Sequence, residues 1–183
     1  MFKQFDKYLS INDVKYLEIY CSQCQTSSYN INYLPNSIIG INIYNRFSDK
    51  NINSYNYDKL PITLQKLNCC FIHYNKLNNL CNLPPLLQTL RTNLIDVNYD
   101  NLPNTLTHLQ IQYAGNKISC NKLPNNIQFL YLDVLKYNKF KIFETFKLPK
   151  TLKCLVLNLN CDKMLAKIYN VTSKSNIDLY LIN

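Results

Sequence analysis

Few residues of this 183-residue chain have the type and spacing that catalysis needs. The two histidines, His73 and His108, stand in no catalytic motif. Two glycines, Gly40 and Gly115, are too few to form a phosphate-binding or dinucleotide-binding loop. We therefore predict a protein that is not an enzyme and that uses no cofactor.

One pair of cysteines, Cys21 and Cys24, has the Cys-x-x-Cys spacing of zinc sites and of redox-active proteins. Zinc would need two further ligands, and the sequence has no second Cys-x-x-Cys. A redox pair ordinarily precedes a helix, whose N-terminus lowers the thiol pKa, whereas this pair follows an expected edge strand. We predict no metal site here, and an oxidising preparation would favour a disulfide.

Positive charge is concentrated in the C-terminal third of the chain. The segment 117–174 holds eleven lysines and three acidic residues, a net charge of +8 out of the chain's +9. Phe140, Phe143 and Phe146 interleave with the lysines, and such a patch can hold nucleic acid or another anionic surface. Alternatively, the phenylalanines fill the core and the lysines form a solvated face. The candidate basic patch consists of Lys136, Lys139, Lys141, Lys147, Lys150 and Lys153.

The elements that must position these residues are set by a repeated phrase, Leu-Pro-x-x-Leu-x-x-Leu-x-Ile, clearest in 102–111. Six copies begin at Leu34, Leu60, Leu83, Leu102, Leu123 and Leu148, at steps of 19 to 26 residues. With the first Leu as position 0, apolar residues fall at positions 4, 7 and 9, except for Thr92 at position 9. The spacing of two from 7 to 9 is typical of a strand, and proline at position 1 forbids a regular helix there. Each copy therefore predicts a bend followed by a strand of about three to five residues.

A single copy cannot bury its apolar side, but stacked copies can. We predict one domain, 1–183, with an N-terminal capping repeat at 1–33, six repeats over 34–159 and a C-terminal cap at 160–183. Its seven or eight parallel strands form a concave sheet, the last strand lying at 177–181. The convex returns are expected to be short, irregular or 3₁₀, with helices at 136–147 and 162–169.

The phrase and its period resemble leucine-rich repeats, specifically the FNIP-type repeats abundant in social amoebae and in giant viruses of amoebae. That family pairs L-P-x-S-L-x-x-L-x-L with F-N-x-x-I, of which 44–47 and 115–118 keep traces. The resemblance covers about 34–159, and bacterial effector repeats share its first half. It implies a right-handed α/β solenoid that binds partners. An F-box, which would indicate a ubiquitin-ligase adaptor, has no room in this sequence.

The predicted strands direct positions 7 and 9 inward and positions 6, 8 and 10 outward, onto the concave face. This face is the usual ligand surface of such solenoids, and tyrosine and arginine are favoured in interfaces. The alternative is a plain solvated sheet surface. The candidate concave binding face consists of Tyr20, Asn42, Tyr44, Lys66, Asn68, Arg91, Asn93, His108, Gln110, Gln112, Phe129, Tyr131 and Asp133.

The expected partner is an unidentified protein, from a host cell if the chain is viral, with nucleic acid as the second candidate. The charged N-terminal residues lack the apolar stretch of a signal peptide, and no apolar run approaches the ~18 residues of a membrane span. We predict an intracellular protein, located in the host cytoplasm or the virion if it is viral. The exposed last strand would also allow a dimer to form through that edge.

Overall fold

The computed structural model describes residues 14–21, 34–45, 60–71, 83–92, 102–113, 123–134, 148–159 and 176–182. These ranges hold eight strands, in chain order β1 (Tyr16–Cys21), β2 (Gly40–Asn45), β3 (Lys66–Phe71), β4 (Thr89–Thr92), β5 (His108–Tyr113), β6 (Phe129–Val134), β7 (Cys154–Leu159) and β8 (Asp178–Ile182). Most of them have six residues and so are slightly longer than predicted.

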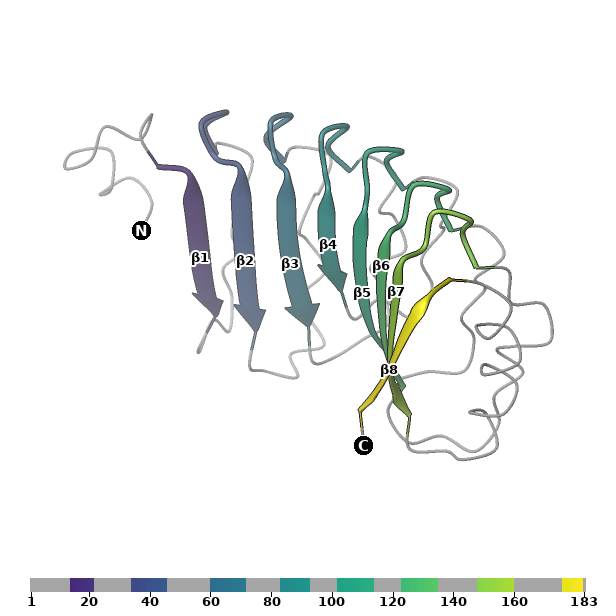
Figure 1. Ribbon diagram of the computed structural model, residues 1–183. Coiled ribbons are helices and arrows are strands. Elements are labelled where there is room, and N and C mark those ends of the chain that lie inside the picture. Colours follow the sequence, from purple (N-terminus) through teal and green to yellow (C-terminus); the bar gives the residue numbers. More distant parts are fainter. Residues whose placement is uncertain are drawn as a thin grey trace.

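All eight strands form one parallel sheet in which chain order and spatial order coincide (Figure 1). The predicted register is confirmed, because equal repeat positions pair across every strand boundary. Position 8, for example, runs Glu18, Asn42, Asn68, Arg91, Gln110, Tyr131 and Val156, and ends at Tyr180. A parallel sheet built from successive copies confirms the prediction of a solenoid.

The Leu-Pro pairs form tight turns immediately before the strands. In every copy the amide of position 4 donates to the proline carbonyl at position 1, as from Leu106 to Pro103 at 3.0 Å. Proline has no amide hydrogen, but its carbonyl is free to close the turn. The amides of positions 5 and 6 then donate to the position 5 carbonyl of the preceding copy, as Thr107 and His108 do to Gln88. The turn thus sets where each strand begins.

A second contact between neighbouring turns comes from side-chain hydroxyls at position 3. Thr105 Oγ1 lies 2.8 Å from both the Pro85 and the Leu87 carbonyl oxygens of the copy before it. Thr63 and Thr151 donate to the equivalent carbonyls of their preceding copies. The third copy has Leu86 at this position, and its side chain is 48% exposed. Where position 3 is threonine, its hydroxyl therefore forms hydrogen bonds that connect successive turns.

The core is a stack of apolar columns, as the repeat predicts. Positions 4, 7 and 9 are buried from β2 to β7, and most position 0 leucines are buried as well. Thr92 is the polar member of column 9 and is nevertheless 1% exposed. Cys69 is fully buried in the same column, as predicted. At β8 the column ends, because Leu181 is 44% exposed.

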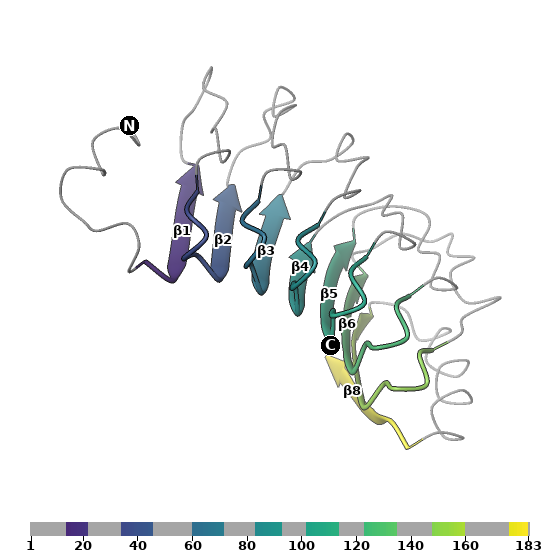
Figure 2. The ribbon, with the colours of Figure 1, turned by 90° about the horizontal axis from the view of Figure 1, so that it is seen from above.

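The sheet curves along its length, and in the C-terminal half the Leu-Pro turns lie on the outer side of the arc (Figure 2). The open face of the sheet is therefore concave, as predicted. Within the ranges given above the structure contains no helix. The helices predicted at 136–147 and 162–169 lie outside those ranges, as does most of each return between a strand and the next turn.

Candidate binding face

Strand alternation places the predicted concave residues on one open face. Columns 6 and 8 cross β2 to β7 in register, so their side chains lie side by side on neighbouring strands. Tyr44 and Gln112 lie in column 10 of the same face. Asn93 lies outside the described residues, since the range that contains β4 ends at Thr92. The Tyr20 side chain is not described either.

A hollow of about 370 Å³ lies in the middle of this face. Eight predicted residues line it: Asn42, Lys66, Asn68, Arg91, His108, Gln110, Phe129 and Tyr131. Prediction did not include Thr89, Cys154 and Val156, which also line it. Thr89 is the short side chain between Lys66 and His108 in column 6, so longer neighbours enclose the space above it. The volume falls in the range of ~300–1,000 Å³ typical of ligand sites.

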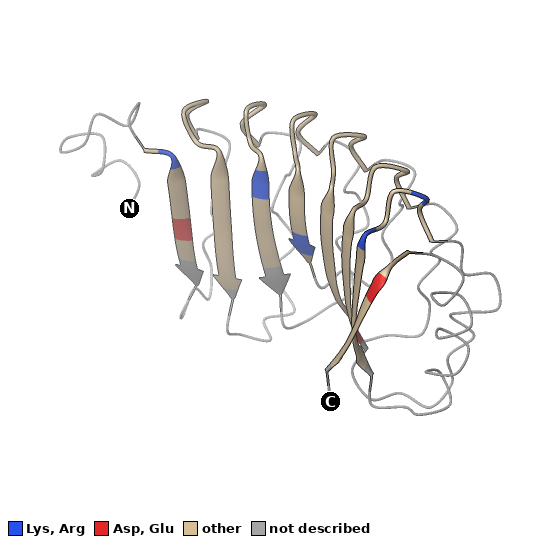
Figure 3. Cartoon of the chain, viewed as in Figure 1, with Lys and Arg blue, Asp and Glu red and all other residues tan. Residues whose placement is uncertain are grey.

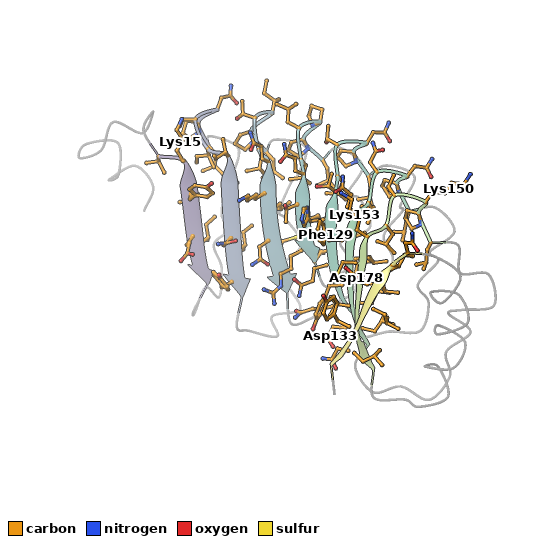
Figure 4. The ribbon with its side chains drawn as sticks, in the orientation of Figure 1. Lys15, Phe129, Asp133, Lys150, Lys153 and Asp178 are labelled. Carbon is orange, nitrogen blue, oxygen red and sulfur yellow. The ribbon has the colours of Figure 1, made fainter. Side chains whose placement is uncertain are left out.

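Two rings stacked on one another form one side of the hollow. His108 and Phe129 are paired neighbours in column 6, with ring centroids 4.3 Å apart and planes 12° from parallel. Phe129 remains 39% exposed and stands near the middle of the face (Figure 4). Burial, and secondarily the charge of Lys66, lowers the pKa of His108 from 6.5. The imidazole is therefore neutral at pH 7, and its stack with Phe129 is an uncharged aromatic surface.

Another aromatic ring lies toward β1. A side chain at Gly40 would collide with the Tyr16 ring. Glycine thus lets the Tyr16 ring lie across β2, and Lys66 Nζ sits 5.9 Å from the ring centroid. Such cation–π contacts at exposed sites are worth about 0.5–1 kcal/mol. The contact therefore favours, by a small margin, a Lys66 ammonium position over the Tyr16 ring.

Arg91 supplies the second positive charge of the hollow. Its Nε is buried and has no hydrogen-bond partner. Asp133, two strands away on β6, is also buried, and its Oδ1 lacks a partner. Burial raises the pKa of Asp133, and the Arg91 charge opposes that rise. Asp133 was predicted as an accessible contact residue, but it is only 9% exposed and does not line the hollow. Figure 4 shows it near the carboxyl end of its strand.

Charge is unevenly distributed over the described face. The basic strand residues lie on the central strands β3 and β4, whereas two acidic residues lie on the outer strands β1 and β8 (Figure 3). A third acidic residue, Asp133, lies on β6. On β1, Glu18 accepts a hydrogen bond of 3.3 Å from Asn42. Of the predicted basic patch, Lys150 and Lys153 are exposed at the turn before β7, and neither lines the hollow. Lys136, Lys139, Lys141 and Lys147 lie outside the described residues.

The described residues contain no group of three or more His, Cys, Asp or Glu side chains that could hold a metal ion. The Cys21 side chain and Cys24 are outside that set. Cys154 lines the hollow as a free thiol, and burial, together with the nearby charge of Asp178, raises its pKa. A raised pKa keeps this thiol protonated, so it is a poor nucleophile. In the part of the chain that the structure describes, no helix is long and apolar enough to cross a membrane.

Comparison of the chain with protein-family models, with curated proteins and with solved structures gave no match.

Proposed function

We propose that this protein is a right-handed leucine-rich-repeat solenoid of the FNIP type, and that it binds a protein partner on its concave face without catalysing a reaction. The fold assignment is supported by six Leu-Pro copies in register on a parallel sheet. Crossover connections between parallel strands are right-handed in about 98% of cases, which favours that hand here.

The observation that carries the binding proposal is the hollow at the centre of the concave sheet. It brings an aromatic stack, Tyr131, three amide side chains and two cations to one open surface. Aromatic residues and arginine are enriched among the residues that dominate binding energy in protein interfaces. Phe129 lines the hollow with 39% of its surface exposed, so an apolar ring is accessible to a partner there.

The proposal is tested by comparing two triple variants as baits in lysate of amoebal cells, the source that the resemblance indicates. The first replaces Arg91, Gln110 and Tyr131 of column 8 by alanine. The second, a matched control, replaces the exposed residues Lys15, Asn104 and Asn125 by alanine, all of them outside the hollow and outside the basic patch. Each captured protein is then purified and titrated against the native chain and both variants.

We expect a partner whose affinity falls at least about thirtyfold in the first variant, because truncation of a central interface residue costs about 2 kcal/mol or more. The control variant should bind like the native chain. Equal affinity for all three baits would refute a concave binding site. Capture of nucleic acid alone, lost at moderate salt and unchanged in the first variant, would instead favour the basic segment 117–174.

A further inference from the structure

We propose that the hollow receives an acidic, extended peptide segment of the partner, with one carboxylate bound by Arg91 and an adjoining apolar or aromatic side chain packed against Phe129 and Tyr131. This inference rests on the proposed function and specifies the chemistry of the partner.

Charge complementarity is the first argument. The hollow is lined by the cations Lys66 and Arg91, and none of its lining residues is acidic. His108 adds little positive charge at neutral pH, because its pKa is lowered from 6.5. Glu18 is on β1 and Asp178 on β8, at the two ends of the sheet. Asp133 on β6 interacts with Arg91 but does not line the hollow. A negatively charged ligand is therefore attracted to the middle of the face.

The second argument is the accessible guanidinium of Arg91. The Arg91 side chain lines the hollow and is only partly buried, although its Nε is covered. Asp133 attracts Arg91, yet its own Oδ1 has no hydrogen-bond partner. Guanidinium is planar and binds carboxylates through two parallel hydrogen bonds. A carboxylate entering from the open side would therefore meet the part of Arg91 that lines the hollow.

The third argument is the size and spacing of the surface. Arg91 on β4 and Tyr131 on β6 share column 8 and are two strand spacings apart, roughly 9–10 Å. An extended chain advances about 3.3 Å per residue, so an acidic residue and an apolar residue two or three positions away reach both sites. Single-stranded nucleic acid also stacks on aromatic rings, but it needs a groove of cations that follows its backbone. Two cations in the hollow favour the peptide.

The test is fluorescence polarisation with two labelled peptides. In the first, glutamates alternate with leucine and tyrosine, and in the second every glutamate is replaced by glutamine. Each is titrated with the native chain, with Arg91→Gln and Lys66→Gln, and with the control Lys15→Gln. The control removes the same charge at an exposed residue before β1, outside the hollow and outside the basic patch. A labelled oligouridine is the nucleic-acid probe, and far-UV circular dichroism verifies that each variant is folded.

We expect the glutamate peptide to bind the native chain about tenfold or more tightly than the glutamine peptide, which is the effect of one charge-assisted hydrogen bond. Arg91→Gln should remove most of this difference, and Lys15→Gln should leave it unchanged. Equal binding of the two peptides would overturn the inference, and this comparison needs no variant. Equal losses in Arg91→Gln and Lys15→Gln would overturn it too, because the attraction would then be diffuse.

Tighter binding of oligouridine than of the glutamate peptide, lost in Arg91→Gln, would overturn the inference in favour of nucleic acid. The two proposals fail differently. If the column 8 alanine variant loses a purified protein partner but the glutamate peptide does not bind, the proposed function stands and only the acidic-peptide inference fails. If neither the partner nor the peptide depends on the hollow, both are wrong.

Discussion

The hydroxyl contacts between turns can be tested by replacing Thr105 with valine. Valine keeps the branched shape of threonine but has no hydroxyl, so only the contacts to the Pro85 and Leu87 carbonyls, both at 2.8 Å, are removed. One hydroxyl hydrogen serves both acceptors, so we count one hydrogen bond, worth about 0.5–1.5 kcal/mol net. The expected loss in free energy of unfolding is therefore about 1 kcal/mol.

Urea unfolding followed by far-UV circular dichroism measures this loss, since the chain has no tryptophan for fluorescence. In a protein of this size a loss of 1 kcal/mol also lowers Tm by about 2–4 °C. Thr105→Ser keeps the hydroxyl and is the matched control. Thr63, two copies earlier, makes equivalent bonds to Asn36 and Ile38 carbonyls. A Thr63→Val and Thr105→Val double variant should therefore lose about 2 kcal/mol, because distant sites add.

The reasoning would be refuted if valine and serine variants at Thr105 had the same stability within about 0.3–0.5 kcal/mol, the usual error of additivity. Such a result would mean that the backbone bonds between turns suffice by themselves. Those bonds, from positions 5 and 6 to the preceding copy, are present in the third copy too, although Leu86 replaces the hydroxyl there.

Three further predictions concern charge in and above the core. Leu109→Asp should abolish the cooperative thermal transition, because it places a carboxylate at a 2% exposed position. The control Gln110→Asp, on the open face, should retain native circular dichroism. A native melting curve for Leu109→Asp would contradict the register. An NMR titration should give His108 a pKa below 6.5. The contribution of His108 to the free energy of unfolding is then complete above pH 6.5 and declines as the pH falls below that value. A titration midpoint at or above pH 6.5 would contradict the argument that burial lowers this pKa. Asp133→Asn should raise the urea midpoint of unfolding at pH 7, because burial raises the folded-state pKa of Asp133 and disfavours its carboxylate form. The substitution should not raise this midpoint at a pH below the ordinary aspartate pKa of 3.8, where the carboxyl is protonated. An unchanged midpoint at pH 7 would show that the Asp133 charge is not disfavoured.

The sheet and its register could be predicted from the sequence because the information repeats. Each Leu-Pro pair marks where a turn begins, and each turn is followed at a fixed distance by the first strand residue, from Gly40 to Cys154. Six copies of the same spacing leave one alignment in which every apolar column is continuous, since a one-residue slip would expose the core face. The lone polar residue of column 9, Thr92, does not disturb this alignment.

The turn hydroxyls were not predicted, although a signal was present. Position 3 is Ser, Thr or Asn in five of the six copies, and Leu86 is the exception. Periodicity of apolar residues says nothing of a polar position, and its role becomes evident only when the turn of one copy lies above that of the next. The Thr105 and Thr151 contacts depend on this stacking.

The hollow has a different origin from the sheet beneath it. Columns 6 and 8 are in register whatever their side chains are, so the backbone alone would make a smooth face. The space arises because short Thr89 lies between Lys66 and His108. Its depth therefore depends on differences between copies, whereas the fold depends on what the copies share. For this reason the repeat could predict which residues face outward but not which of them enclose a site.

This separation explains why Asp133 departs from its prediction. It occupies an outward position of β6, yet its side chain is buried, and this burial raises the pKa of its carboxyl. A residue selected only for the repeat would be apolar inside or solvated outside, and Asp133 is neither. Asp133 and Arg91 attract one another electrostatically, but neither Arg91 Nε nor Asp133 Oδ1 has a hydrogen-bond partner. A ligand carboxylate on Arg91 would weaken the support that Asp133 receives, so binding of an acidic peptide should raise the pKa of Asp133 further.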